Sequence, residues 1–200
     1  MLSSLFLVLG ASAVSGFAPQ APARAATAQG AKVLKGVGIT DSFPGFFDPL
    51  GLAAGASADR LKFYREAELK HSRVAMLAAT GFLVGEGFHP LFGGEIDLPS
   101  YVAFQSTPLQ QFWPVVLWAL FAIEGATSIP TFENPFVGGM WVPKQDHDAG
   151  DLGFDPLGLL PESKAEAVKM ATMELNNGRL AMIGIAGMVG QELVTGAKIF

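Results

Sequence analysis

Three stretches of the chain have the length and apolar character of helices that cross a membrane. We expect these helices over residues of about 58–87, 109–125 and 162–192. The first and third would each be ~45 Å long, which exceeds the ~30 Å thickness of bilayer hydrocarbon. Their polar opening turns, KFYREAE and KAEAVKM, should therefore stand in the headgroup region. The pattern predicts an all-α membrane protein with three transmembrane helices.

An internal repeat relates the first and third of these helices. FFDPLGL at 46–52 recurs as GFDPLGLL at 153–160, and ELKHSRVAML at 68–77 recurs as ELNNGRLAMI at 174–183. The copies are offset by 107 and 106 residues respectively. Because one unrelated helix separates them, the two related helices must cross the bilayer in the same direction. A pseudo-twofold axis along the membrane normal follows from this arrangement.

Each repeated helix carries a Glu and an Arg five residues apart, Glu68 with Arg73 and Glu174 with Arg179. Five residues turn a helix by about 500°, which leaves the two side chains roughly 140° apart. They are therefore poorly placed to pair within one helix. Each charge left unpaired near the bilayer centre would cost about 2.5–3.5 kcal/mol. We expect the helices to cross, held by two crossed pairs, Glu68 with Arg179 and Glu174 with Arg73.

Small residues recur along both helices at a spacing that allows close approach of helix backbones in lipid. We expect this interface to be lined by Ala75, Ala78, Ala79, Gly81 and Gly85 of the first helix and by Ala181, Gly184, Gly187 and Gly190 of the third. The same residues leave flat space for something other than side chains.

A second polar set offers single metal ligands along the same helices. His71 follows Glu68 by three residues, Asn177 follows Glu174 by three, and Gln191 lies 17 residues beyond Glu174. Each carries a lone pair able to coordinate a hard cation such as magnesium. Ligands scattered in this way fit several independent one-ligand centres rather than one cage. Chlorophylls would be held in this manner.

Composition narrows the class of protein further. Half of the 200 residues are hydrophobic, and 16% are charged, fewer than in soluble domains. Cysteine is absent, which excludes disulfides and thiolate chemistry. The net charge is −5 and no basic cluster occurs, so we expect no nucleic-acid partner. No nucleophile–base set or phosphate loop is visible, which favours a binding protein over an enzyme. Asp146, His147, Asp148 and Asp151 are expected to be solvated loop residues rather than a metal cluster.

The first 31 residues are expected to be targeting sequence. Residues 1–16 have the short apolar run and small residues of a signal peptide. Residues 17–31, which open Phe17-Ala18-Pro19 and lack acids, have the style of a plastid transit segment, although a plain secretory signal is the alternative. The mature domain would then comprise residues 32–200.

Basic residues indicate the orientation in the membrane. They gather at the entry of the first helix, at Arg60, Lys62, Arg65 and Lys70, and are missing between the first and second helices. The N-terminus should therefore face the untranslocated side. In a plastid this side is the stroma, and the C-terminus would lie in the thylakoid lumen.

The ExxHxR and ExxNxR motifs with the duplicated FDPLGL loops resemble the light-harvesting chlorophyll-binding antenna proteins. The resemblance covers roughly residues 40–200. The Phe-Ala-Pro start, the length and GFHPLFGGEIDLPS at 87–100 are most similar to the fucoxanthin–chlorophyll a/c branch, and less to green-lineage chlorophyll a/b antennae. It implies chlorophyll a, chlorophyll c and fucoxanthin or a related xanthophyll as cofactors. It also implies a multi-pass place in the thylakoid membrane, beside a photosystem I or II core and other antenna subunits.

The resemblance also assigns roles to residues. It implies axial ligands to chlorophyll magnesium at Glu68, His71, Glu174, Asn177 and Gln191. Arg73 and Arg179 match the crossed ion pairs, and the loops at Asp48 and Asp155 match segments that hold carotenoid ends. Glu124 stands where the family has a ligand, but the glutamine expected eight residues earlier is Val116. His89, in an apolar turn at the membrane edge, is a further candidate.

Two other functions compete with an antenna. A photoprotective member of the same family would dissipate energy when the lumen acidifies, and would sense pH through residues on that side: Glu86, His89, Glu95, Asp97 and Glu192. A small transporter or channel would use the intramembrane charges as an ion path, but inverted repeats would favour that class and the repeat here is parallel.

Overall fold

The computed structural model describes residues 37–38, 47–53, 55–94, 96–106, 108–133, 141–144 and 146–199. The expected signal and transit segments lie outside these residues, as does Glu95. The described chain is helical, with three long helices, α2 (Ala58–Gly87), α4 (Leu109–Thr131) and α5 (Lys164–Thr195). Two short elements, η1 (Leu91–Gly94) and α3 (Ser100–Ala103), lie between α2 and α4.

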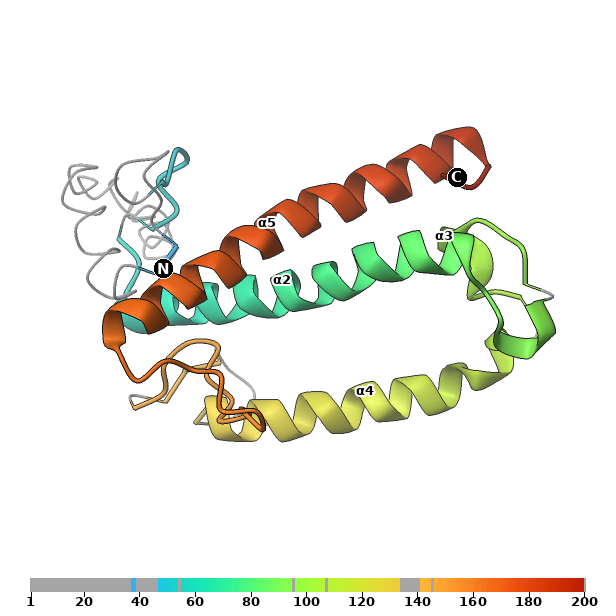
Figure 1. Cartoon of the computed structure of the whole chain (residues 1–200). Coiled ribbons are helices and arrows are strands. Elements are labelled where there is room, and N and C mark those ends of the chain that lie inside the picture. Colours follow the sequence, from blue (N-terminus) through green and yellow to red (C-terminus); the bar gives the residue numbers. More distant parts are fainter. Residues whose placement is uncertain are drawn as a thin grey trace, which may run out of the picture.

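α2 and α5 pack against each other and run in the same direction, whereas α4 runs the opposite way (Figure 1). Local chemistry explains where the two related helices begin and end. The Ser57 hydroxyl accepts the Arg60 N–H at 3.3 Å and caps the start of α2. Gly196, with φ +63°, ends α5 in the left-handed conformation that glycine adopts readily.

α4 is longer than the sequence pattern indicated. It continues to Thr131, past Gly125 where we expected its end. The Glu124 carboxylate bonds Lys70 of α2 and the Ser128 hydroxyl one turn later, so this charged residue stabilises the helix rather than ending it. By length and composition α4 could cross a membrane over Leu109–Ile129. No other helix in the described part of the chain meets that criterion.

α2 and α5 meet most closely where Ser72 faces Gly178. A Cβ added to Gly178 would lie 2.2 Å from the Ser72 Cβ, and Ser72 is fully buried. At the later glycines an added Cβ would meet no atom within 4 Å, namely at Gly81, Gly85, Gly184, Gly187 and Gly190. The expectation that these glycines line the helix interface is therefore wrong, because the two helices diverge beyond their contact (Figure 1). Ala75, one turn after Ser72, is buried as expected.

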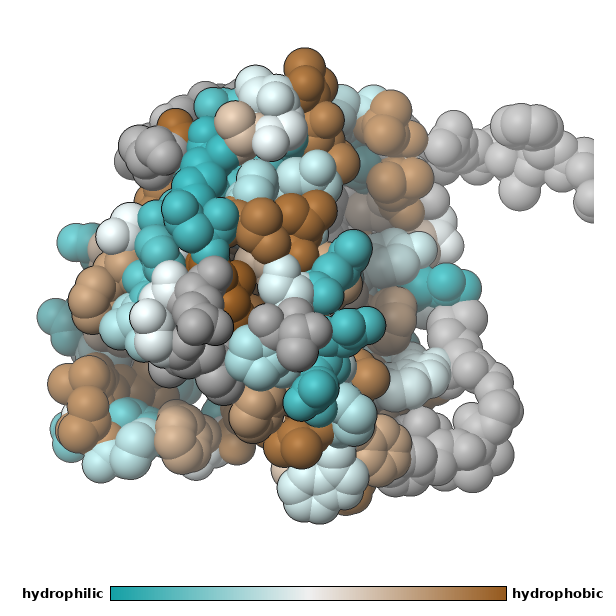
Figure 2. Space-filling model, turned by 90° about the vertical axis from the view of Figure 1, so that its right-hand side faces the viewer, coloured by the Kyte–Doolittle hydropathy of each residue, from teal (hydrophilic) through white to brown (hydrophobic). Residues whose placement is uncertain are grey.

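The C-terminal ends of α2 and α5 are joined through α3. The Glu192 carboxylate of α5 accepts the backbone N–H groups of Ser100 at 3.3 Å and Tyr101 at 2.8 Å. The Glu86 carboxylate of α2 accepts the Ser100 hydroxyl at 3.4 Å and the Ile199 N–H at 2.8 Å. Both carboxylates are buried. Figure 2 views this end of the molecule, where hydrophilic and hydrophobic surfaces lie side by side.

The helix contact predicts opposite effects of one substitution at two glycines. Gly→Ala in a helix is normally favourable by about 1 kcal/mol, and Gly184→Ala should therefore raise or leave unchanged the midpoint of thermal loss of helical circular dichroism. Gly178→Ala should lower that midpoint, because overpacking costs about 1–3 kcal/mol. Adding Ser72→Gly should restore part of the loss. Equal midpoints for the two alanine variants would contradict the contact.

Candidate functional site

Two ion pairs join α2 and α5 at their contact. The Arg73 Nε lies 2.8 Å from the Glu174 Oε1, and the Arg179 Nε lies 2.9 Å from the Glu68 Oε1. Each pair takes its two partners from different helices. The four side chains are between about one quarter and two fifths exposed, so part of each charged group faces outward from the helix pair.

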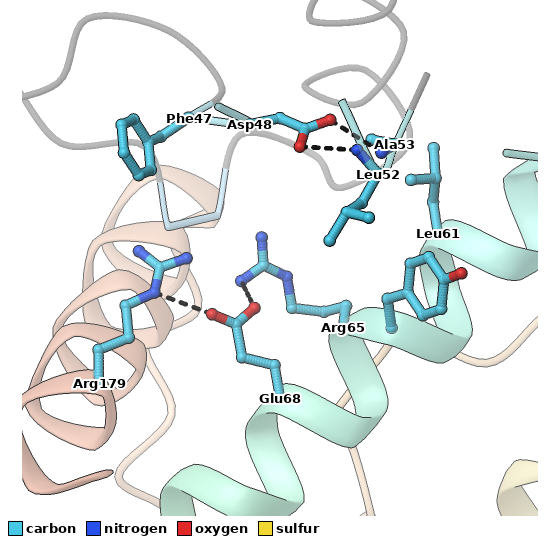
Figure 3. Close-up of a pocket in the computed structure, with 9 residues that line it drawn as sticks. Phe47, Asp48, Leu52, Ala53, Leu61, Arg65, Glu68 and Arg179 are labelled. Atoms are coloured by element: carbon cyan, nitrogen blue, oxygen red, sulfur yellow. Dashed lines mark hydrogen bonds and ion pairs between the residues drawn. The ribbon is translucent and has the colours of Figure 1, made fainter. Parts of the chain in front are cut away.

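A third arginine makes the two pairs unequal. The Arg65 Nη1 donates to the second oxygen of Glu68 at 2.8 Å, so two guanidinium groups hold this carboxylate (Figure 3). In the described part of the chain Glu174 is paired with Arg73 alone. The repeat relates Arg65 to Ala171, so this departure from the repeat is the sequence signal for the difference.

The backbone of α2 orients the imidazole ring of His71. Its Nδ1 lies 2.7 Å from the Ala67 carbonyl oxygen, which can only accept, so we assign the proton to Nδ1. In the neutral ring the Nε2 lone pair is then free, on an exposed side chain. A hydrogen bond of this kind fixes the ring of a metal-ligating histidine.

The other candidates on α5 are accessible as well. Asn177 and Gln191 are exposed, and Glu174 is half-buried, with Oε1 engaged by Arg73. Open space borders the glycines that follow on both helices. A flat group with a central magnesium could therefore approach these ligands without meeting a neighbouring side chain at those positions.

Glu124 is held by a partner that the sequence did not indicate. Its two carboxylate oxygens lie 3.1 and 2.6 Å from the Lys70 Nζ, and the Thr127 and Ser128 hydroxyls are each 3.4 Å from Oε2. The carboxylate is thus neutralised, like Glu68 and Glu174, and its side chain is 59% exposed. This pair bridges α2 near its middle and α4 in its second half.

His89 lies in a small polar group at the end of α2. Its Nε2 is 3.8 Å from the Asp97 Oδ1, and Lys198 also pairs with Asp97. The His89 Nδ1 is buried and has no partner among the described atoms. His89 therefore lies away from the crossed pairs, at the same end as Glu86 and Glu192.

The two FDPLGL copies form matching turns in which an aspartate binds backbone amides. Asp48 accepts the Leu52 and Ala53 N–H groups at 2.9 and 2.8 Å (Figure 3), and Asp155 accepts those of Leu159 and Leu160 at 3.1 and 2.9 Å. The Leu160 amide and then the Leu159 amide lower the pKa of Asp155. Both oxygens of each aspartate are engaged, so these residues shape the loops.

The turns present apolar side chains outward. More than 60% of each is exposed at Phe47, Leu50, Leu52, Phe154, Leu157, Leu159 and Leu160. The first turn borders a cavity of about 180 Å³ that reaches Glu68, Arg65 and Arg179 (Figure 3). An elongated apolar molecule could lie on such a surface with one end near the ion pairs.

The acidic loop before the second copy is only partly solvated. Asp146, Asp148 and Asp151 are exposed as expected, but the His147 side chain is 10% exposed. Its Nε2 lies 3.4 Å from the Glu66 Oε2, and Glu66 is buried. The expectation that His147 is solvated is wrong, because His147 and Gly150 of this loop both contact Glu66 in the first turns of α2.

The extra arginine on Glu68 predicts unequal effects of two related substitutions. Arg179→Leu leaves Glu68 with Arg65, whereas Arg73→Leu leaves Glu174 without a guanidinium, at a cost of up to about 3 kcal/mol in hydrocarbon. Arg73→Leu should therefore lower stability more, measured by circular dichroism during titration of a mild detergent with dodecyl sulfate. Combining Arg65→Leu with Arg179→Leu should remove the difference. Equal losses for the two single variants would show that Arg65 does not compensate.

Comparison with known proteins adds independent information. A family model for chlorophyll A-B binding proteins matches residues 34–193. The light-harvesting complex stress-related protein 3.2 of Chlamydomonas reinhardtii is 46% identical over 168 residues, which cover 82% of this chain and 64% of that relative. A fucoxanthin-chlorophyll a-c binding protein of Isochrysis galbana is 41% identical over 162 residues, 76% of this chain and 74% of the relative. A chlorophyll a-b binding protein of Petunia hybrida is 35% identical over 175 residues, 79% and 62% of the two chains.

These relatives place the chain within one family but not within one branch. All three are described as chloroplastic. The chain spans less than two thirds of the length of the stress-related relatives. The stress-related protein 3.2 shares more sequence identity with this chain, 46%, than the Isochrysis galbana fucoxanthin-chlorophyll protein does, 41%. Members of this family are pigment-binding proteins and not enzymes. The chain belongs to the chlorophyll a-b binding protein family.

Proposed function

We propose that the protein is a light-harvesting scaffold of the thylakoid membrane, in which α2, α4 and α5 each span the bilayer and hold chlorophylls and xanthophylls. The composition of α4 supports the second span. α2 and α5, with 30 and 32 residues, are long enough for the other two. The crossed pairs support insertion of both, because they neutralise charges that hydrocarbon would otherwise exclude.

The main support for this proposal is that side-chain atoms able to ligate a metal lie next to helix surfaces that no other part of the described chain covers. His71 offers a free Nε2 and Asn177 an exposed amide, and the glycines that follow on α2 and α5 border open space. α4 does not cover these surfaces by close packing comparable to that between α2 and α5. Flat macrocycles with an axial coordination site would fill them, and magnesium accepts the nitrogen and oxygen ligands present.

The residues of the chain would provide ligation, spacing and local charge. Bound chlorophylls and carotenoids would supply light absorption and excitation transfer. The proposed axial ligands are Glu68, His71, Glu174, Asn177 and Gln191, with Glu124 and His89 as further candidates. Arg73 neutralises the Glu174 carboxylate and Arg179 the Glu68 carboxylate. The turns at Asp48 and Asp155 would position the apolar loops for carotenoid ends.

The pigments and partners are part of the same proposal. The fucoxanthin-chlorophyll a-c binding relative supports chlorophyll a, chlorophyll c and fucoxanthin or a related xanthophyll. The excitation would pass to a photosystem I or II core, with other antenna subunits as neighbours. The N-terminus would lie in the stroma and the C-terminus in the lumen.

A pigment spectrum tests the scaffold directly. The protein purified in mild detergent should show chlorophyll a, chlorophyll c and carotenoid bands, and light absorbed by the carotenoid should excite chlorophyll a emission. His71→Leu should lose one chlorophyll band while the helical circular dichroism stays unchanged. A folded but colourless wild-type protein would refute the proposal and favour the ion-path alternative.

Energy dissipation at low pH is a second candidate function. It is favoured by the stress-related relatives and by the burial of Glu86 and Glu192 around one short helix. Two negative carboxylates in one buried site repel each other, so protonation of one relieves this repulsion. The backbone amides of Ser100 and Tyr101 oppose this protonation, because they donate to Glu192 and favour its charged form. A change in protonation would act on the joint between α2, α3 and α5.

Fluorescence lifetime distinguishes the two functions. If the protein dissipates energy, the chlorophyll lifetime in detergent should fall between neutral and mildly acid pH. Glu192→Gln should make the lifetime nearly independent of pH. The matched variant Glu166→Gln, on an exposed first turn of α5, should respond as the wild type does. A wild-type lifetime that does not change with pH would count against this second function.

A further inference from the structure

Two loop glycines are each held at both backbone groups by one helix. The Gly150 N–H donates to the Glu66 Oε2 at 2.7 Å, and its carbonyl accepts the Arg73 Nη2 at 2.9 Å. The Gly38 N–H donates to the Thr172 Oγ1 at 3.2 Å, and its carbonyl accepts the Arg179 Nη1 at 3.1 Å. We call these two arrangements the Gly150 clamp and the Gly38 clamp.

The helix residues of the two clamps are related by the internal repeat, at an offset of 106 residues. Glu66 and Arg73 are seven residues apart, as are Thr172 and Arg179, which places each couple on one helix face two turns apart. Both glycines have positive φ, +86° and +82°. A Cβ on Gly150 would lie 2.5 Å from the Leu69 Cδ1, and one on Gly38 would lie 2.5 Å from the Leu175 Cδ2. The helix side of the contact is thus duplicated, whereas the two glycines lie 112 residues apart and are not related by the repeat.

Each clamp is connected to one ion pair through its arginine. Arg73 uses Nε for Glu174 and Nη2 for Gly150, which lies in the chain leading into α5, the helix that carries Glu174. Arg179 likewise binds Glu68 of α2 and Gly38 in the chain leading into α2. Each arginine therefore holds the other helix and the segment before it, and its guanidinium plane is set by both.

The two clamps differ in the residue that accepts the glycine N–H. Thr172 is a neutral hydroxyl, whereas Glu66 is a carboxylate that is 2% exposed. Glu66 Oε2 also lies 3.4 Å from the His147 Nε2, and its Oε1 is buried with no partner in the described part of the chain. Burial of a carboxylate is costly unless hydrogen bonds compensate. The Gly150 and His147 contacts are the compensation that the structure provides.

We propose that Glu66 is a positioning residue for the ligand site at Glu174. By fixing Gly150 it fixes the carbonyl that orients Arg73, and Arg73 in turn sets the Glu174 carboxylate. Thr172 does the same for Glu68 through Gly38 and Arg179. The inference rests on the proposed function, in which both carboxylates ligate chlorophyll magnesium. Residues that orient a metal ligand typically change metal affinity by about 10–100-fold when replaced.

The experiment refolds the full chain in detergent with chlorophyll a and fucoxanthin, and compares matched variants. Glu66→Leu removes the acceptor of the Gly150 clamp, and Thr172→Val removes that of the Gly38 clamp. Glu174→Leu and Glu68→Leu identify the absorption bands of the two ligand sites. For each variant we would measure chlorophyll per protein and the difference spectrum against the wild type.

We expect each clamp variant to affect the same absorption band as the variant of the glutamate that it positions. Glu66→Leu should lower binding of chlorophyll at Glu174 by about 10-fold or more, with a difference spectrum that matches Glu174→Leu. Thr172→Val should change the band of the Glu68 site instead, with a smaller loss, because Arg65 also holds the Glu68 carboxylate. In the Glu174→Leu background, Glu66→Leu should cause no further loss of chlorophyll. A full Glu174 band in Glu66→Leu, or a further loss in that background, would overturn the proposal.

Two controls keep the result interpretable. Glu66→Gln retains an oxygen acceptor for the Gly150 N–H and should preserve the Glu174 band. If Glu66→Leu yields no pigmented protein, this variant decides: a missing Glu174 band overturns the positioning role, and a full band supports it. Wild-type protein that binds no chlorophyll would instead refute the proposed function, which separates the two failures.

Discussion

The crossed pairing of Glu and Arg between α2 and α5 is the constraint on which the rest of the structure depends. In each pair the arginine of one helix bonds the glutamate of the other helix. The pairs lie beside the Ser72–Gly178 contact, where the backbones come closest. They neutralise the carboxylates without enclosing them, and the glutamates remain half-buried. Arginines bond both oxygens of Glu68, whereas at Glu174 the described contact of Arg73 is to Oε1 alone.

The pairs divide the helices into a closed part and an open part. Near the crossed pairs, protein contacts dominate: the glycine clamps, the Glu66–His147 contact and the packing of α2 on α5. Beyond them the helices diverge, their glycines border open space, and α3 with Glu86 and Glu192 rejoins the far ends. The Lys70–Glu124 pair links α4 to α2 at the level of the crossed pairs, on the side of α2 away from α5 (Figure 1). Contacts therefore join α2 and α5 at both ends of the helix pair, and the helix surfaces between these ends stay uncovered by the described residues.

Family membership indicates that the protein binds chlorophyll, but it does not distinguish harvesting from dissipation of energy. The family model and the relatives establish a chlorophyll-binding family, while the stress-related and fucoxanthin-binding relatives are both similar to this chain. The crossed pairs and the FDPLGL turns do not by themselves distinguish harvesting from dissipation. In the proposed dissipating function, the buried carboxylates of Glu86 and Glu192 would be the groups that change their charge while the ligand set stays the same.

The sequence by itself determined what local spacing controls. The five-residue separation of Glu and Arg predicted pairing between helices, the repeat predicted parallel α2 and α5, and His71 was visible as a ligand candidate. The partners of Lys70 and Glu66 were decided only by the tertiary structure, since they come from another helix or a distant loop. The small-residue pattern indicated close packing along both helices, yet it could not indicate where they diverge. The crossing angle and the positions of α3 and α4 set those contacts, and neither is a property of local sequence.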